Sequence, residues 1–266
     1  MASFQVSGNT SNSVDVMSGN YRGLLVAATA TTPADLTLAV MNGIQVNVTL
    51  YRRSGTYTVH SGPVLPIALA YNPGSNEGQV NQSYNALYVD WGGIVNLQPG
   101  DRLQVKTSVS GSATGQVVTT TLRSATGIEY YVPQVLNYAV NLQQVTQTIP
   151  CGDNVTKVGI VTLDDVDAIT AVNFSSSIFS DNYSIPDFRA FAAEVFPFGG
   201  TNTTRNTYLI YDGPETQKTE VTCTVDTAQT AITYVVSFAG IRTKESTENA
   251  IRLSNKIADS ITSQYL

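Results

Sequence analysis

Two stretches of this chain follow the same plan, and their first residues, 23 and 159, are 136 positions apart. Residues 23–26 (GLLV) are followed by 36–38 (LTL), and residues 159–162 (GIVT) are followed by 172–174 (VNF). Each stretch joins a glycine and an apolar run to a second apolar segment, as neighbouring β-strands do. The echo predicts one β module used twice. Such a chain, with few groups typical of an active site, is better suited to assembly than to catalysis.

The composition predicts an all-β protein with a core of its own. A chain of 266 residues is long enough for one large domain or two of ordinary size, and folding should bury roughly 70% of its extended surface. Hydrophobic residues make up 42% but charged residues only 13%, and Ser, Thr, Asn, Gln and Gly take up the difference. The Ser/Thr/Val-rich runs, with 20 Gly and 10 Pro, favour many short strands joined by turns.

The charge is divided unequally between the two halves. Up to Pro133 the chain has 6 Lys and Arg against 6 Asp and Glu, and beyond it 8 against 14, so the whole net charge of −6 belongs to the second half. An acidic chain without a basic run is poorly suited to bind phosphate backbones, because that affinity comes mainly from Lys and Arg. Direct nucleic-acid binding is therefore not expected.

The ends of the chain and its cysteines bear on the compartment. The first residues, MASFQ, show no basic segment followed by an apolar one, and no run approaches the ~18 apolar residues of a membrane span. We therefore expect a soluble protein that folds in a cytoplasm. Cys151 and Cys223 could pair, but two cysteines in a chain without a secretion signal are more often free buried thiols.

Alternating or apolar runs locate the expected strands. The amino-terminal residues 1–20 are rich in Ser, Asn and Gly and indicate an arm or a loosely held first strand. Asn42-Gly43 suits a hairpin turn between two of the runs, and residues 64–71 form a further apolar run. The expected strands are residues 21–28, 36–40, 44–50, 86–90 and 117–122 in the first half, and 155–163, 168–174, 208–211, 220–225 and 232–238 in the second.

One turn and two helices complete the local pattern. Pro99-Gly100-Asp101 forms a turn, after which apolar alternation resumes, and it resembles the turn before a late strand in many jelly rolls. Residues 186–195 place Phe and Ala side chains on one helical face behind an initial proline. Residues 246–263 carry an apolar stripe with Glu248 and Arg252 at i,i+4 spacing, which predicts a terminal amphipathic helix.

Few residues suggest chemistry. His60 is the single histidine, so any nucleophile and histidine pair would need it, and no Gly-x-Ser-x-Gly motif occurs. The acidic cluster of Asp164, Asp165 and Asp167 offers oxygen ligands for structural Ca²⁺, although its spacing is not that of an EF-hand. We expect no catalytic or cofactor-binding residues and no required cofactor, with these aspartates as weak metal candidates.

Trp91 carries the main alternative. It is the single tryptophan, and Gly92-Gly93 follows it, so an exposed ring here could form the platform of a carbohydrate-binding protein. Burial in a core or at a subunit interface is the more common fate of such a ring. A pair of glycosidase carboxylates is not excluded by the sequence, because their separation depends on the fold. The alternative function is thus a carbohydrate-binding or polysaccharide-active β-sandwich protein.

As a pattern, the whole chain resembles the double jelly-roll major capsid proteins of tailless, membrane-containing icosahedral phages, the adenovirus-type lineage, and in size a corticovirus-like coat protein. The resemblance is carried by two equal β-rich halves, low charge, an amino-terminal arm, late helices and Pro99-Gly100-Asp101. It implies two tandem eight-stranded jelly rolls with short helices in loops and a C-terminal helix. Residues 1–133 would hold the arm and first roll, and residues 134–266 the second roll and terminal helix.

The resemblance also implies a function. In that family three copies form a pseudo-hexagonal capsomer of an icosahedral shell above an internal membrane. It implies a structural, non-enzymatic bacteriophage virion protein that is made and assembled in the host cytoplasm. Its partners would be two further copies, neighbouring capsomers and a vertex (penton) protein, with contacts to viral membrane proteins left open. The short gaps between expected strands do not predict the loop towers of larger relatives. A second alternative is a trimeric fibre or spike protein, against which the equal two-module division counts.

Overall fold

The structure, a computed structural model, describes residues 2–7, 10–29, 38–71, 84–127, 129, 131–142, 144–162, 169–184, 186, 208–216, 218–226, 228 and 232–242. Within them the fold is all-β with a few short helices. The elements up to residue 124 are β1 (Ser3–Ser7), β2 (Ser11–Val16), β3 (Gly19–Thr29), α1 (Leu38–Asn42), β4 (Ile44–Arg52), β5 (Gly55–Pro63), α2 (Val64–Tyr71), β6 (Tyr84–Leu97), β7 (Arg102–Val109), the 3-10 helix η2 (Gly111–Ala113) and β8 (Val117–Ser124). Those that follow are β9 (Val132–Asn141), β10 (Thr146–Gly152), β11 (Val155–Thr162), β12 (Ile169–Ser175), β13 (Ser180–Ser184), β14 (Tyr208–Thr216), β15 (Thr219–Val225) and β16 (Ile232–Ile241).

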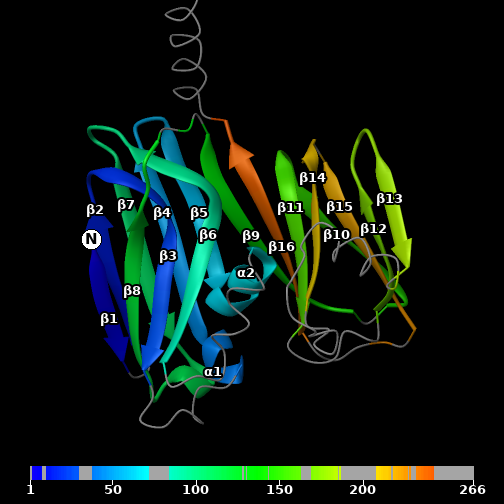
Figure 1. Cartoon of the computed structure of the whole chain (residues 1–266), viewed down its shortest axis with the longest axis horizontal. Coiled ribbons are helices and arrows are strands. Elements are labelled where there is room, and N and C mark those ends of the chain that lie inside the picture. Colours follow the sequence, from blue (N-terminus) through cyan, green and yellow to red (C-terminus); the bar gives the residue numbers. More distant parts are fainter. Residues whose placement is uncertain are drawn as a thin grey trace, which may run out of the picture.

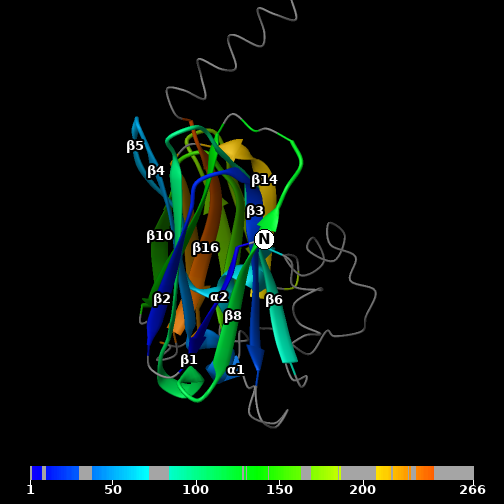
Figure 2. The ribbon, with the colours of Figure 1, turned by 90° about the vertical axis from the view of Figure 1, so that its left-hand side faces the viewer.

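The strands repeat one order twice. Strands β1 to β8, here called the first roll, pair as β1-β8-β3-β6 and β2-β7-β4-β5; strands β9 to β16, the second roll, pair as β9-β16-β11-β14 and β10-β15-β12-β13. Each roll is thus a jelly roll of two four-stranded layers, which Figure 2 shows for the first roll. The expected double jelly roll is confirmed. The C-terminal helix expected over residues 246–263 lies outside the described residues, as does the helix at 186–195 except for Pro186.

One sheet runs through both rolls, which stand side by side in Figure 1. Its order is β14-β11-β16-β9-β5-β4-β7-β2, and the rolls join where β5 pairs in parallel with β9 at His60 and Val135. Along β4 the inward side chains are buried and the intervening ones partly exposed, as expected for a strand with one face on a core. Strand β16 is instead buried on both faces, because each face of the shared sheet is covered there.

Helix α2 fills the space between the rolls. Seven of its eight residues are buried, because it packs against β6 of the first roll and against β11, β14 and β16 of the second. The apolar run at 64–71 therefore has no polar face. Gly159 of β11 lies beneath this helix, and a Cβ added there would stand 2.4 Å from Cβ of Ala70. The seam between the rolls thus depends on a close approach that glycine permits.

One local expectation is wrong, and at the amino terminus the structure decides between two alternatives. Residues 38–40 of the strand expected at 36–40 are helical, in α1, and Asn42-Gly43 ends that helix through a bond from Gly43 N to Val40 O rather than turning a hairpin. Of the arm or loosely held first strand expected over residues 1–20, the strand alternative holds: residues 3–7 and 11–16 are strands β1 and β2, paired in two different sheets. Pairing with β8 and β7 satisfies the backbone hydrogen-bonding groups of these residues. The Ser/Asn-rich sequence does not predict this pairing.

The Pro99-Gly100-Asp101 turn lies between β6 and β7, before the seventh strand of the first roll, as expected. Asp101 N donates to Gln98 O at 2.9 Å, and Gln98 N donates to the Asp101 carboxylate at 3.0 Å. The same carboxylate oxygen accepts from Arg52 Nε at 2.9 Å, with the side chains of Arg52 and Asp101 only 7% and 5% exposed. This buried ion pair ties the turn to the end of β4.

Candidate functional site

The candidate site is the seam, the region where the first roll contacts the second. One of its walls is formed by a bulge in β6. Tyr21 of β3 pairs with Val95 of β6, but Gly23 pairs with Asp90. Four residues of β6, 91–94, therefore lie opposite a single residue of β3, Arg22. Gly92 has a φ of +73° and allows the sharp bend. The bulge carries Trp91 into the interior, where its side chain is fully buried.

A buried carboxylate holds the bulge in place. Asp90 is 1% exposed and accepts from Arg22 Nη2 at 2.6 Å and Arg22 Nε at 2.9 Å. It also accepts from Tyr88 OH at 2.6 Å and, through its second oxygen, from Gly92 N at 2.9 Å. Burial and the bond to Asp90 raise the pKa of Tyr88 to about 12, so this hydroxyl stays a donor at neutral pH. The donors serve as structural supports rather than as an acid and base pair.

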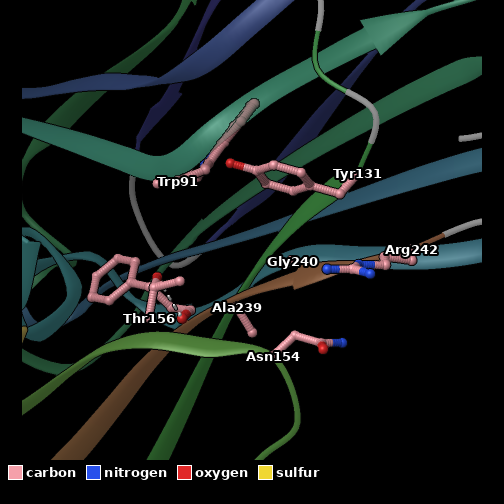
Figure 3. Close-up of a pocket in the computed structure, with 9 residues that line it drawn as sticks. Trp91, Tyr131, Asn154, Thr156, Ala239, Gly240 and Arg242 are labelled. Carbon is pink, nitrogen blue, oxygen red and sulfur yellow. Dashed lines mark hydrogen bonds between the residues drawn. The ribbon is translucent and has the colours of Figure 1, made fainter. Parts of the chain in front are cut away.

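A small cavity of about 110 Å³ opens at the seam beside this bulge. It is lined by Trp91 and Tyr131 on one side and by strands of the second roll on the other, with Arg242 among the lining residues. Figure 3 shows the Tyr131 hydroxyl pointing toward Trp91. Trp91 Nε1 has no partner within the described residues. The lining residues that the structure describes combine apolar and polar groups and include no carboxylate pair of the glycosidase kind.

Trp91 therefore does not form the exposed platform that a carbohydrate-binding protein would need. Its burial agrees with the packing interpretation of this residue. The acidic cluster Asp164, Asp165 and Asp167 lies outside the described residues, so calcium binding there stays a prediction. Among the described residues, no group of His, Cys, Asp and Glu is placed to hold a metal. No described helix has the length and apolar character needed to cross a membrane.

The two cysteines are free, buried thiols in the core of the second roll. Cys151 lies on β10 and Cys223 on β15. Burial raises the pKa of each thiol to about 12, and the nearby Cys223 adds to this effect at Cys151. Both thiols are therefore protonated at neutral pH and unsuited to nucleophilic catalysis.

His60 belongs to the seam and not to a catalytic group. It lies on β5 directly beside Val135 of β9, and it is fully buried. Neither ring nitrogen has a hydrogen-bond partner among the described residues. Burial lowers the pKa of His60 to about 3, so the ring is neutral in the folded protein over the physiological range.

This burial predicts acid sensitivity. The pKa of His60 is about 3 when folded and about 6.5 when unfolded, so stability that is complete above pH 6.5 is lost as the pH falls toward 3. At pH 5 the loss from this residue should be about 2 kcal/mol. Urea unfolding of the parent and of His60→Phe between pH 7 and 4 measures it. The variant should lose less stability on acidification, and equal pH slopes would contradict the assignment.

Sequence reasoning missed the seam because its parts are distant along the chain. Arg22 and Asp90 are separated by 68 positions, and Ala70 and Gly159 by 89. The available signals were the uniform apolar run of α2, the glycines after Trp91 and the glycine that opens the second echo. Each has several structural explanations until the strand order is known.

Comparisons with known proteins bear on this architecture. No protein-family model matches the chain, and no curated protein has a matching sequence. The major capsid protein P2 of bacteriophage PM2 matches in structure with a TM-score of 0.59 and 12% identity, over 90% of this chain and 94% of that one. The capsid protein of Sulfolobus turreted icosahedral virus matches with a TM-score of 0.57 and 12% identity, over 91% and 94%. At this identity the likeness shows a shared fold along almost the whole of each chain.

Proposed function

We propose that this chain is the major capsid protein of an icosahedral virus, a structural and non-enzymatic component of the virion. The observation that supports this most is the double jelly roll itself, a fold shared with two major capsid proteins over 90% and 91% of this chain. A fold alone does not fix a function. The seam adds support, because an apolar helix and a fully buried tryptophan lie between the two rolls, and buried Asp90, paired with half-exposed Arg22, holds the bulge that carries the tryptophan.

The finer proposal concerns the assembly. The unit would be a homotrimer forming a pseudo-hexagonal capsomer, which meets neighbouring capsomers and a vertex protein in a bacteriophage shell. Residues 1–133 and 134–266 would be its two structural units, and assembly would take place in the host cytoplasm. The weak surface charge favours close packing of many copies, because little like-charge repulsion has to be overcome.

Light scattering on the purified full chain tests this proposal. A stable species near three times the chain mass of 28.4 kDa is the expected result. Negative-stain images of that species should show a compact ring with six lobes. A monomer at every accessible concentration, without higher assemblies, would contradict the proposal. Binding of a monomer to polysaccharide would favour the carbohydrate alternative instead.

A further inference from the structure

The cavity at the seam has a buried floor and an open rim. Three buried residues, here called the floor, line its inner end: Trp91, Phe238 and Ala239. The other lining residues are exposed or partly exposed and are here called the rim: Gly92, Tyr131, Asn154, Thr156, Gly240 and Arg242. Strand β6 of the first roll and strands β11 and β16 of the second contribute to it. A mainly apolar floor with a few polar groups around it is the usual construction of a small-molecule site.

The floor contains a hydrogen-bond donor that the described residues leave unsatisfied. Trp91 is fully buried, and its Nε1 has no partner in the described part of the chain. An indole N–H can donate but not accept, and a buried donor without an acceptor is costly. Buried tryptophans therefore usually have an acceptor at this atom. The cavity beside the ring has room for one.

The wall around this donor has already engaged two of its own acceptors. The backbone oxygen of Asn154 accepts from Gly240 N at 3.2 Å. The backbone oxygen of Phe238 accepts from Thr156 Oγ1 at 3.3 Å. A ligand that only donates hydrogen bonds would leave the indole N–H unpaired. The wall is thus better suited to a ligand that accepts hydrogen bonds.

The charge at the rim favours an acceptor that is negative. Among the described lining residues only Arg242 carries a formal charge, and in Figure 3 its guanidinium lies between Tyr131 and Asn154. Two carboxylates lie near the cavity without lining it. Asp90 accepts from Arg22 and Gly92 N, and Glu129 accepts from Ile94 N at 2.8 Å. Both carboxylates are therefore engaged in holding the bulge of β6.

We propose that the cavity at the seam binds a small carboxylic acid in its anionic form. The carboxylate accepts from Trp91 Nε1 and faces Arg242, and a short apolar body packs on Phe238 and Ala239. An enclosed cavity of about 150 Å³ holds one benzene molecule, so the volume of about 110 Å³ suits an acid the size of propionate. The ligand contacts both rolls and stabilises the seam, and no covalent bond changes. This inference goes beyond the proposed function and does not depend on assembly.

Propionate and its neutral analogue propionamide test the proposal on the purified full chain at pH 7 and constant ionic strength. Trp91 is the single tryptophan, so its fluorescence reports on the cavity directly. Propionate should change the emission saturably, with a dissociation constant of about a millimolar for so small a ligand. Propionamide should bind about tenfold more weakly, because it carries no charge. At about ten times its dissociation constant, propionate should raise the unfolding temperature by about 3–5 °C.

Two exposed arginines provide a matched pair of variants. Arg242→Gln removes the charge at the rim, whereas Arg53→Gln removes an equal charge between β4 and β5. The first should weaken propionate binding about tenfold, and the second should bind propionate as the parent does. Trp91→Phe keeps an aromatic ring without the N–H. Its unfolding temperature should rise less with propionate than that of the parent.

Three results would each overturn the inference and mean that water alone satisfies the indole N–H. They are equal responses to propionate and propionamide, equal propionate binding by the two arginine variants, and no response at about a hundred times the expected dissociation constant. None of them bears on the proposed function, which the mass of the assembled species tests separately.

Discussion

Replacing Asp101 by alanine is expected to lower the free energy of unfolding by about 3–5 kcal/mol, because it leaves a buried guanidinium without its counter-ion. Arg52 Nε would lose its 2.9 Å partner and keep the bond from Nη2 to Asn96 O at 2.7 Å. The turn would also lose the bond from Gln98 N to the carboxylate. Urea unfolding followed by circular dichroism at pH 7 measures the change.

Asp15→Ala is the matched control for this prediction. Asp15 also pairs with an arginine of the first roll, Arg102, but at 3.3 Å and with both side chains 38% exposed. Exposed pairs of this kind contribute about 0.2–1 kcal/mol. The two variants should therefore differ several-fold in their effect. If Asp101→Ala lowered the free energy of unfolding no more than Asp15→Ala does, the Pro99-Gly100-Asp101 turn would not depend on the ion pair.

The echo shows how far the sequence predicts the fold. Residues 23–26 and 159–162 lie in β3 and β11, the third strands of the two rolls, so this part of the match identified equivalent elements. The second part did not. Residues 172–174 lie in β12, whereas residue 38 begins α1, and the corresponding strand β4 starts at Ile44. An apolar triplet fits a strand or a short helix equally well, so its sequence alone does not distinguish the two.

The seam could not be predicted from local pattern. Periodicity identifies an element by the face it exposes, and α2 exposes almost none, so residues 64–71 were recognisable only as an apolar run. The position of Asp90 depends on the bulge in β6, which the register with β3 creates. In the sequence His60 is an ordinary strand residue. Its ring is buried without a described hydrogen-bond partner because β5 pairs in parallel with β9 at this position. These features arise from contacts between distant segments.

The glycine that opens the second echo is where local sequence and distant packing meet, and Gly159→Val should lower the free energy of unfolding by about 3 kcal/mol. The new side chain would begin 2.4 Å from Cβ and 2.9 Å from Cα of Ala70, so α2 must move away from β11. Gly115→Val is the control, because a Cβ there meets nothing within 4 Å. Thermal and urea unfolding of the two variants measure the difference.

A double-mutant cycle separates the contact with α2 from the general cost of replacing a strand glycine. Gly159→Ala should destabilise the protein, and Ala70→Gly should cost about 1 kcal/mol for a glycine inside a helix. Combined, they should cost less than the sum of the two, since Ala70→Gly removes the atom nearest the added methyl group. Strict additivity would show that Gly159 is needed for its backbone alone. Coupling would show that the chain uses this glycine to set α2 of the first roll against β11 of the second.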